Sequence, residues 1–305
     1  MSQYGWKSKT IRKVLKSKME QWIKSINDEV LQKALTKDVI VTGGSITSML
    51  MGDEIKDFDV YFKTKETTIA IAKYYCETFI EQNPNAQVTP AVTEKDGRVE
   101  ILISSLGAIC SDDSPNSEEA QYEDNLGEGG ADKIEQSVES NKDAPKYTYR
   151  PMFLSNNAIT LSDKVQLVIR FYGQPDQIHE NYDYQHCKHV YELETDSLIL
   201  NAKAMECILS KTLLYTGSLY PICSLFRMRK FLDRGWRISA GEIVKMSFQI
   251  SNLDLKNINV LKEQLTGCDM MYMRLLINAL EADKYSGVDI DNSYVIKLVD
   301  RIFND

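Results

Sequence analysis

Residues 39–62, which read VIVTGGSITSMLMGDEIKDFDVYF, decide the fold that this sequence predicts. The apolar run at 39–41 predicts a strand. Gly43 and Gly44 predict a tight turn after it, because a glycine has no Cβ to obstruct the backbone. A short helix over 46–51 should follow, and a second apolar run predicts a second strand. The segment therefore predicts a strand, a turn, a helix and a strand in that order.

The residues at the start of this short helix and on the strand after it indicate a phosphate-binding site. Ser45 is expected to cap the helix and to donate to a phosphate oxygen, and Gly52 is expected to end it. Asp57 and Asp59 fall on one face of the second strand, because strand side chains alternate. Paired carboxylates repel each other unless a cation or a proton lies between them. A helix start offers unpaired N–H groups and partial positive charge to a phosphate, so the pattern predicts metal-assisted phosphoryl chemistry. The predicted metal ligands and catalytic residues are Asp57 and Asp59, and the predicted nucleotide-binding residues are Gly43, Gly44 and Ser45.

The same segment resembles the head motif of the DNA polymerase β-like nucleotidyltransferases, most closely that of the tRNA CCA-adding enzymes and bacterial poly(A) polymerases. That branch has two glycines, a short helix ending in Leu-Leu-Gly (here Leu50-Met51-Gly52) and an Asp-x-Asp at this spacing. The resemblance implies an α+β fold: a nucleotidyltransferase palm with a mixed β-sheet, followed by an all-α C-terminal domain. It also implies Mg²⁺ or Mn²⁺ as cofactor and a nucleoside triphosphate as substrate, ATP or CTP being favoured. Thr47-Ser48 stands where the branch usually carries Arg-Asp.

Composition limits the remaining classes of protein. An apolar fraction of 43% and a charged fraction of 26% over 305 residues are typical of a soluble globular protein. No apolar run approaches the ~18 residues of a membrane span, and the N-terminus lacks the apolar core of a signal peptide. The six cysteines have no paired spacing, which indicates reduced thiols and a cytoplasmic protein. The oligomeric state is left open.

Charge is unevenly distributed. Residues 111–145 contain eleven acidic and two lysine residues, a net charge of −9, against −8 for the whole chain. This polar, aperiodic segment reads as a disordered acidic insertion, or alternatively as an acidic arm that competes with nucleic acid. It interrupts a predicted head domain at 1–195, which a helical neck and tail domain at 196–305 is expected to follow.

Periodicity outlines the other elements of the head. A single amphipathic helix is predicted over 8–34, whose basic face is either solvated or contacts a nucleic-acid backbone. The basic residues of that face are Lys7, Lys9, Arg12, Lys13, Lys16 and Lys18. A helix is expected over 66–82 and a hairpin over 87–104 that turns at Asp96-Gly97. The later strands are expected at 149–161, 164–171 and 182–192, with a turn or short helix at 174–180.

A third catalytic carboxylate is expected on a strand beside Asp57 and Asp59; Asp183 is the favoured candidate and Glu100 the alternative. Asp183 lies in a segment that resembles the Arg-Arg-Asp-Phe-Thr end of the CCA-type head, and Glu100 lies between two apolar residues. The family would place this acid where the chain has Gln166. The three histidines at 179, 186 and 189 suggest zinc only weakly, because no second cysteine has ligand spacing. Buried or hydrogen-bonded histidines near the sheet are the favoured interpretation.

The stretch from Phe226 to Ile238 is similar to the neck segment of the family, in which arginines read the incoming base. Arg227 and Lys230 match its basic positions and are the predicted nucleotide contacts, although a basic solvated face fits them equally well. The predicted reaction is transfer of a nucleoside monophosphate from an NTP to a hydroxyl, with an RNA 3′ end such as that of tRNA as the favoured acceptor. Transfer to a small molecule or protein, and a catalytically inactive nucleotide- or RNA-binding module, are the alternatives.

Overall fold

The computed structural model describes residues 5–84, 89–95, 97–102, 108–109 and 149–255, and also 257, 260, 263–264, 293 and 296–297. The chain divides into two compact units. The units are Met1–Glu180 with Cys187–Met205, and Asn181–His186 with Glu206–Asp305. The acidic insertion predicted at 111–145 lies outside the described residues, and the domain boundary after residue 195 stays a prediction.

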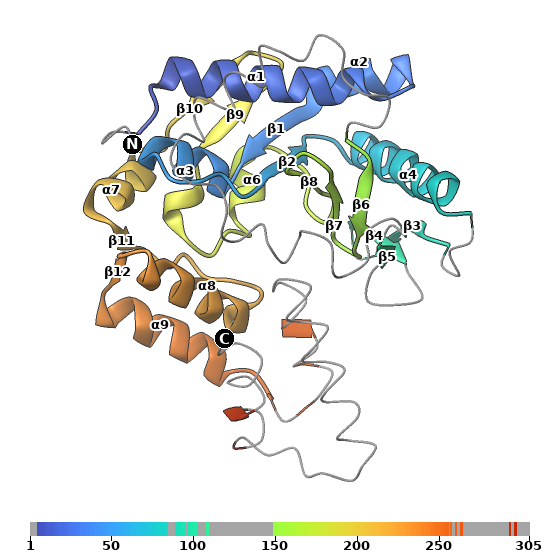
Figure 1. The fold of residues 1–305 in the computed structure, drawn as a ribbon. Coiled ribbons are helices and arrows are strands. Elements are labelled where there is room, and N and C mark those ends of the chain that lie inside the picture. The colour runs from blue at the N-terminus through green and yellow to red at the C-terminus, as the bar shows by residue number, and fades with distance from the viewer. Residues whose placement is uncertain are drawn as a thin grey trace. The chain divides into compact units, whose positions relative to one another are not determined.

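A mixed sheet of eight strands forms the centre of the first unit (Figure 1). The strand order is β10-β9-β1-β2-β8-β7-β6-β5; β2 and β8 are parallel and every other neighbouring pair is antiparallel. The strands are β1 (Val39–Thr42), β2 (Phe58–Phe62), β5 (Ala108–Ile109), β6 (Pro151–Leu154), β7 (Ala158–Leu161), β8 (Val165–Val168), β9 (Val190–Glu192) and β10 (Ser197–Ile199). The predicted strands of the opening segment, β1 and β2, are therefore adjacent at the centre of the sheet.

Helices pack against this sheet and bury their apolar sides. The helices of the first unit are α1 (Ser8–Lys24), α2 (Glu29–Asp38), α3 (Gly44–Met51), α4 (Lys65–Gln82) and α6 (Pro175–His179). Helix α1 contacts α2, α3 and β10, whereas α4 contacts β2, β6 and a separate hairpin. Ile11, Leu15 and Trp22 of α1 are fully buried, and the Trp22 indole donates to the Tyr75 hydroxyl of α4 at 2.8 Å. The 3.6-residue apolar repeat of α1 thus supplies one side of the core.

The single helix predicted over 8–34 is wrong, because two helices occupy this stretch. Helix α1 ends at Lys24, and the side chain of Asp28 then accepts from the N–H groups of Val30 and Leu31 as the N-cap of α2. Lys18 does not belong to the exposed basic face either. It is 8% exposed, and its Nζ lies 2.5 Å from an Asp163 carboxylate oxygen.

The hairpin predicted over 87–104 contains β3 (Ala91–Lys95) and β4 (Arg98–Leu102), which form their own two-stranded sheet. Two other strand predictions need correction. The stretch 149–161 folds into two strands, β6 and β7. The stretch 182–192 is mostly not a strand: it contains the 3₁₀ turn η1 (Gln185–Cys187), and only its last three residues form β9.

The described part of the second unit is mainly helical, and the predicted α+β fold class with a mixed sheet and a helical C-terminal part is confirmed. Its elements are α8 (Pro221–Asp233), α9 (Ala240–Ser251) and the short parallel pair β11 (Thr212–Leu213) and β12 (Arg237–Ile238); α7 (Ala202–Ser210) leads into it from the first unit. In the described part of the chain, no helix is both long and apolar enough to span a bilayer. Cys76, Cys187 and Cys207 are free thiols, whereas Cys223 is disulfide-bonded, so the expectation that all six cysteines are reduced does not hold for Cys223.

The entry into α1 is attached to the end of α3. The Trp6 N–H donates to the Met49 carbonyl at 2.8 Å. A Cβ added to Gly5 would overlap the carbonyl of Leu50, so the backbone at this position needs glycine. The start of α1 and the last turn of α3 are therefore in direct backbone contact.

Candidate active site

The glycine turn joins β1 to α3 and lies against a carboxylate. Gly43 has a φ of +93°, a conformation that side-chain-bearing residues rarely adopt, and its N–H donates to the Cys187 carbonyl at 3.2 Å. A Cβ at this position would lie 2.5 Å from Oδ2 of Asp59. Strand pairing explains the proximity, because Thr42 is the register partner of Asp59. Glycine at 43 thus lets the backbone approach the carboxylate closely.

The start of α3 presents unsatisfied polar groups. The N-cap is Gly43 and makes no side-chain cap, so the expectation that Ser45 caps the helix is wrong: Ser45 is the second helical residue. The hydroxyl of Ser45 is buried, at 1% residue exposure, and has no hydrogen-bond partner. A Cβ on Gly44 would meet nothing within 4 Å. An uncapped helix start, a buried hydroxyl and open space at Gly44 together suit a small anion, since helix N-termini attract phosphate groups.

The two predicted carboxylates lie beside this turn. Asp59 is in β2, and Asp57 is the residue just before that strand. Both are partly exposed, whereas Phe58 between them is 3% exposed. This alternation puts both carboxylates on the solvent-accessible side of the strand, as the sequence predicted. Carboxylate oxygens that solvent can reach are the ligands that Mg²⁺ prefers, so Asp57 and Asp59 fit a magnesium ion.

Neither candidate for the third carboxylate lies on a strand adjacent to β2. Glu100 lies on β4 in the separate hairpin, opposite Thr93. The cross-strand neighbours of Asp59 are Thr42 on β1 and Gln166 on β8. In the part of the chain that the structure describes, no group of three or more His, Cys, Asp or Glu side chains is placed to hold a metal ion. The central strands thus place two carboxylates and the Gln166 amide together, whereas the nucleotidyltransferase motif that the sequence resembles has three carboxylates.

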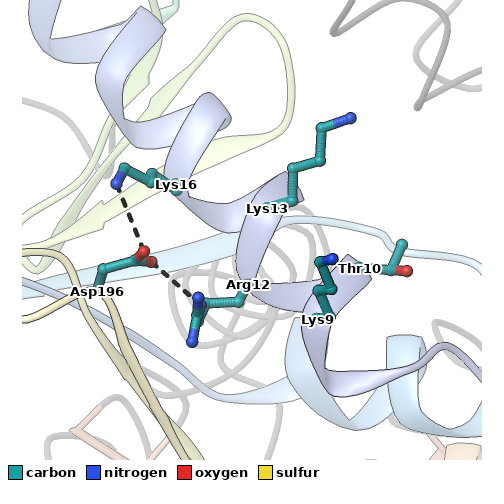
Figure 2. Close-up of a pocket in the computed structure, with 6 residues that line it drawn as sticks. All are labelled: Lys9, Thr10, Arg12, Lys13, Lys16 and Asp196. Carbon is teal, nitrogen blue, oxygen red and sulfur yellow. Dashed lines mark hydrogen bonds and ion pairs between the residues drawn. The ribbon is translucent and has the colours of Figure 1, made fainter.

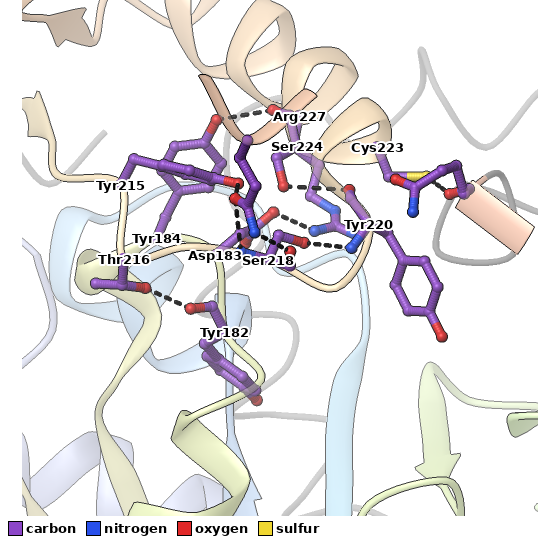
Figure 3. Close-up of polar contacts among 12 residues, drawn as sticks. Tyr182, Asp183, Tyr184, Tyr215, Thr216, Ser218, Tyr220, Cys223, Ser224 and Arg227 are labelled. Carbon is purple, nitrogen blue, oxygen red and sulfur yellow. Dashed lines mark hydrogen bonds and ion pairs between the residues drawn. The ribbon is translucent and has the colours of Figure 1, made fainter. Parts of the chain in front are cut away.

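Asp183, the other candidate, belongs to the second unit and forms an ion pair there (Figure 3). Its carboxylate, 13% exposed, accepts from the Arg227 guanidinium of α8. Thr216 donates its backbone N–H to the Asp183 carbonyl at 2.8 Å. Lys230, one helical turn after Arg227, is exposed. The roles of Asp183 in catalysis and of Arg227 and Lys230 in nucleotide binding remain predictions.

A buried polar network adjoins the glycine turn through Thr42, the last residue of β1. Buried or hydrogen-bonded histidines were predicted near the sheet, but the sequence did not indicate their partners. The Thr42 hydroxyl donates to the His189 carbonyl at 2.6 Å and lies 2.8 Å from Nε2 of His179. Because its single proton is used, the hydroxyl accepts from His179, which fixes the neutral Nε2–H tautomer. Nδ1 of His189 accepts from the Asn201 N–H at 3.2 Å. Burial lowers the pKa of His179 and of His189 to about 4, so both rings are neutral at pH 7.

Fold and site together define an α+β protein whose central strands carry a glycine turn beside paired carboxylates. This chain belongs to the Gabija anti-defense 2 family, whose family model matches residues 13–211. A curated relative, "Gabija anti-defense 2" of Bacillus phage SPbetaL7, is 20% identical over 293 residues, covering 92% of this chain and 56% of the relative. The chain thus spans a little over half the length of that relative.

Solved structures that resemble the chain include two CCA-adding enzymes. One is the Thermotoga maritima CCA-adding enzyme complexed with tRNA, at 10% identity and a TM-score of 0.39, covering 88% of this chain and 54% of that one. The other is the Bacillus stearothermophilus CCA-adding enzyme with CTP, at 11% identity and a TM-score of 0.35, covering 83% and 51%.

Proposed function

We propose that this protein transfers a nucleoside monophosphate from an NTP to a hydroxyl acceptor. The observation that carries the proposal is the buried, unpartnered Ser45 hydroxyl at an uncapped helix start, beside a glycine whose backbone adjoins the Asp59 carboxylate. A buried hydroxyl without a partner costs roughly 1–3 kcal/mol, which a bound phosphate oxygen would offset. The motif that brings these groups together resembles that of the polymerase β-like nucleotidyltransferases.

In the proposed reaction the acceptor oxygen attacks the α-phosphorus, the bond from that phosphorus to the bridging β-oxygen breaks, and pyrophosphate leaves. The proton of the acceptor hydroxyl passes to a solvent water in the same step. Gly44 and Ser45 would bind the triphosphate at the helix start, and Asp57 and Asp59 would hold Mg²⁺. When bound, the metal would supply positive charge that neutralises the phosphates and favours the deprotonated acceptor.

The favoured acceptor is an RNA 3′ end, with tRNA one candidate. Transfer to a protein or small molecule is the second possibility. The name of the curated relative adds a biological setting, because an anti-defense protein would direct such a modification at a component of the Gabija system or at RNA in the infected cell. We place the reaction in the cytoplasm, where NTPs and Mg²⁺ are available.

A catalytically inactive binding module is the competing function, and Gln166 beside Asp59 favours it. Incubation with each α-labelled NTP, Mg²⁺ or Mn²⁺, and extract from phage-infected cells separates the two. Label should enter RNA with the wild-type protein and not with the Asp57→Asn/Asp59→Asn variant. Label in protein or small molecules would indicate that the acceptor is not RNA. Absence of any metal-dependent labelling would refute the transfer reaction.

Ser45→Ala tests the phosphate contact separately. Removing the unpartnered hydroxyl should leave the folded protein as stable as the wild type or more so, while NTP binding weakens about tenfold. Thermal unfolding with and without NTP measures both effects. Equal NTP stabilisation of the variant and the wild type would contradict the assignment of Ser45.

A further inference from the structure

The first half of α1 carries a stripe of cations that the proposed reaction does not use. Lys9, Arg12, Lys13 and Lys16 follow one another at the three- and four-residue spacing that puts side chains on one side of a helix. Lys9, Arg12 and Lys13 are exposed, and Lys16 is partly exposed. Together with Thr10 and Asp196 they line a surface hollow of about 380 Å³ (Figure 2). These six residues are called the α1 cationic face.

One carboxylate already occupies part of this face. Asp196, in the turn between β9 and β10, lies 3.6 Å from Nε of Arg12 and 3.4 Å from Nζ of Lys16. The Asp196 carboxylate also accepts a hydrogen bond from the Tyr191 hydroxyl at 3.0 Å. The cations thus hold an anionic oxygen pair on one side of the hollow, and the face as a whole keeps a net charge of +3. This positive face is carried by a chain of net charge −8.

The composition of the stripe differs from that of an ordinary solvated helix. Solvated faces usually interleave acidic and basic residues. The first turn of α1 has no acidic residue, and Glu20, the acidic residue within Ser8–Lys24, comes only after the stripe. The exposed residues of α4, by comparison, include both signs, such as Lys73 and Glu77. The positive charge of the α1 cationic face is therefore concentrated.

We infer that the α1 cationic face binds the phosphate backbone of a nucleic acid. From Lys9 to Lys16 the helix rises roughly 10 Å, which matches about three phosphates at roughly 3.4 Å per step along a strand. The aromatic residue within Ser8–Lys24 is Trp22, which is buried and cannot stack on a base. Contact should therefore be with phosphates and independent of base sequence. The inference goes beyond the proposed transfer reaction and does not depend on it, because binding requires no turnover.

The test measures affinity for a fluorescein-labelled 20-nucleotide RNA of mixed sequence, without NTP or metal, by anisotropy over a range of salt. Lys9→Gln/Lys13→Gln should weaken binding roughly 20- to 60-fold at about 0.1 M salt, since each lost phosphate contact removes roughly 0.7–0.9 from the salt slope. Lys33→Gln/Lys37→Gln on α2 is the matched control: it has the same spacing, the same exposure and the same change in net charge. It should bind like the wild type.

A gain-of-binding variant tests the same face in the other direction. Asp196 has a φ of +47°, which asparagine tolerates well. Asp196→Asn therefore keeps the turn and removes the competing carboxylate, and RNA binding should tighten roughly five- to eightfold at about 0.1 M salt.

Several results would overturn the inference. These are unchanged binding by Lys9→Gln/Lys13→Gln, an equal loss in the α2 control, or polyglutamate of equal charge binding as tightly as RNA, which would indicate an acidic protein partner. The assay contains neither NTP nor metal, so failure of the transfer reaction leaves this test unaffected.

Discussion

Adjacent glycines at the start of α3 have different physical surroundings. At Gly43 both the positive φ and the Asp59 carboxylate exclude a side chain. At Gly44 neither constraint applies, because the space around its Cα is open. The first glycine therefore serves the fold of the turn, and the second leaves room where a phosphate is proposed to bind. A sequence motif shows that both residues are glycine, but it does not show that their roles differ.

The prediction at this scale is a contrast between two alanine variants. Gly43→Ala should destabilise the protein by at least ~2 kcal/mol, through left-handed backbone strain and the clash with Asp59. Gly44→Ala should be neutral or stabilise by roughly 0.4–1 kcal/mol, because alanine restricts the unfolded chain, yet NTP binding should fall about tenfold. Urea unfolding and NTP titration measure the two effects. Full NTP binding by a folded Gly44→Ala variant would remove Gly44 from the proposed site.

At the scale of elements, the sequence predicted the part of the site that is contiguous along the chain. β1, α3 and β2 formed as the residues in 39–62 indicated, since local periodicity and turn chemistry determine them. Periodicity failed at 8–34, because buried apolar residues stand on both sides of the break that the Asp28 cap creates, Ile26 before it and Leu31 after it. The strand that pairs with β2 on its other side could be placed only through the family resemblance, which put Gln166 where the third acid is expected. Gln166 lies on β8, over a hundred residues after Asp59, and pairing between distant strands leaves no local pattern.

The register of β2 and β8 gives the prediction for this scale. Gln166→Glu would put a third carboxylate directly beside Asp59. Without metal it should destabilise the protein by up to ~1 kcal/mol, because like charges face each other across the strands. With metal it should tighten Mn²⁺ binding about tenfold, as followed by calorimetry. The gain should disappear when Asp59→Asn is added; a gain that persists would place the ion away from this sheet position.

At the scale of the whole molecule, the buried histidines behind the glycine turn make folding sensitive to acid. His179 is 8% exposed and His189 is fully buried, and burial lowers the pKa of each from 6.5 to about 4. Between pH 6.5 and 4 the unfolded chain binds protons that the folded chain does not. Their contribution to stability is therefore complete above pH 6.5, decreases as the pH falls toward 4, and changes no further below that.

The expected loss at pH 5 is about 2 kcal/mol for each histidine relative to pH 7.5. Urea unfolding at the two pH values, followed by tryptophan fluorescence, measures it. His179→Gln should remove about half of the pH dependence attributed to the pair. An unchanged pH dependence in that variant would mean that His179 is not the titrating group.

The contact between Gly5-Trp6 and the end of α3 has a geometric consequence for the two surfaces on this unit. One end of α3 adjoins the glycine turn and the other adjoins the segment that leads into the α1 cationic face. An eight-residue helix is about 12 Å long, so helix length fixes the spacing between the two. Inserting one residue into α3 would shift one end by roughly 1.5 Å and rotate it by about 100° relative to the other. The length of α3 would therefore set the register between a strand bound at the proposed α1 surface and the proposed triphosphate site.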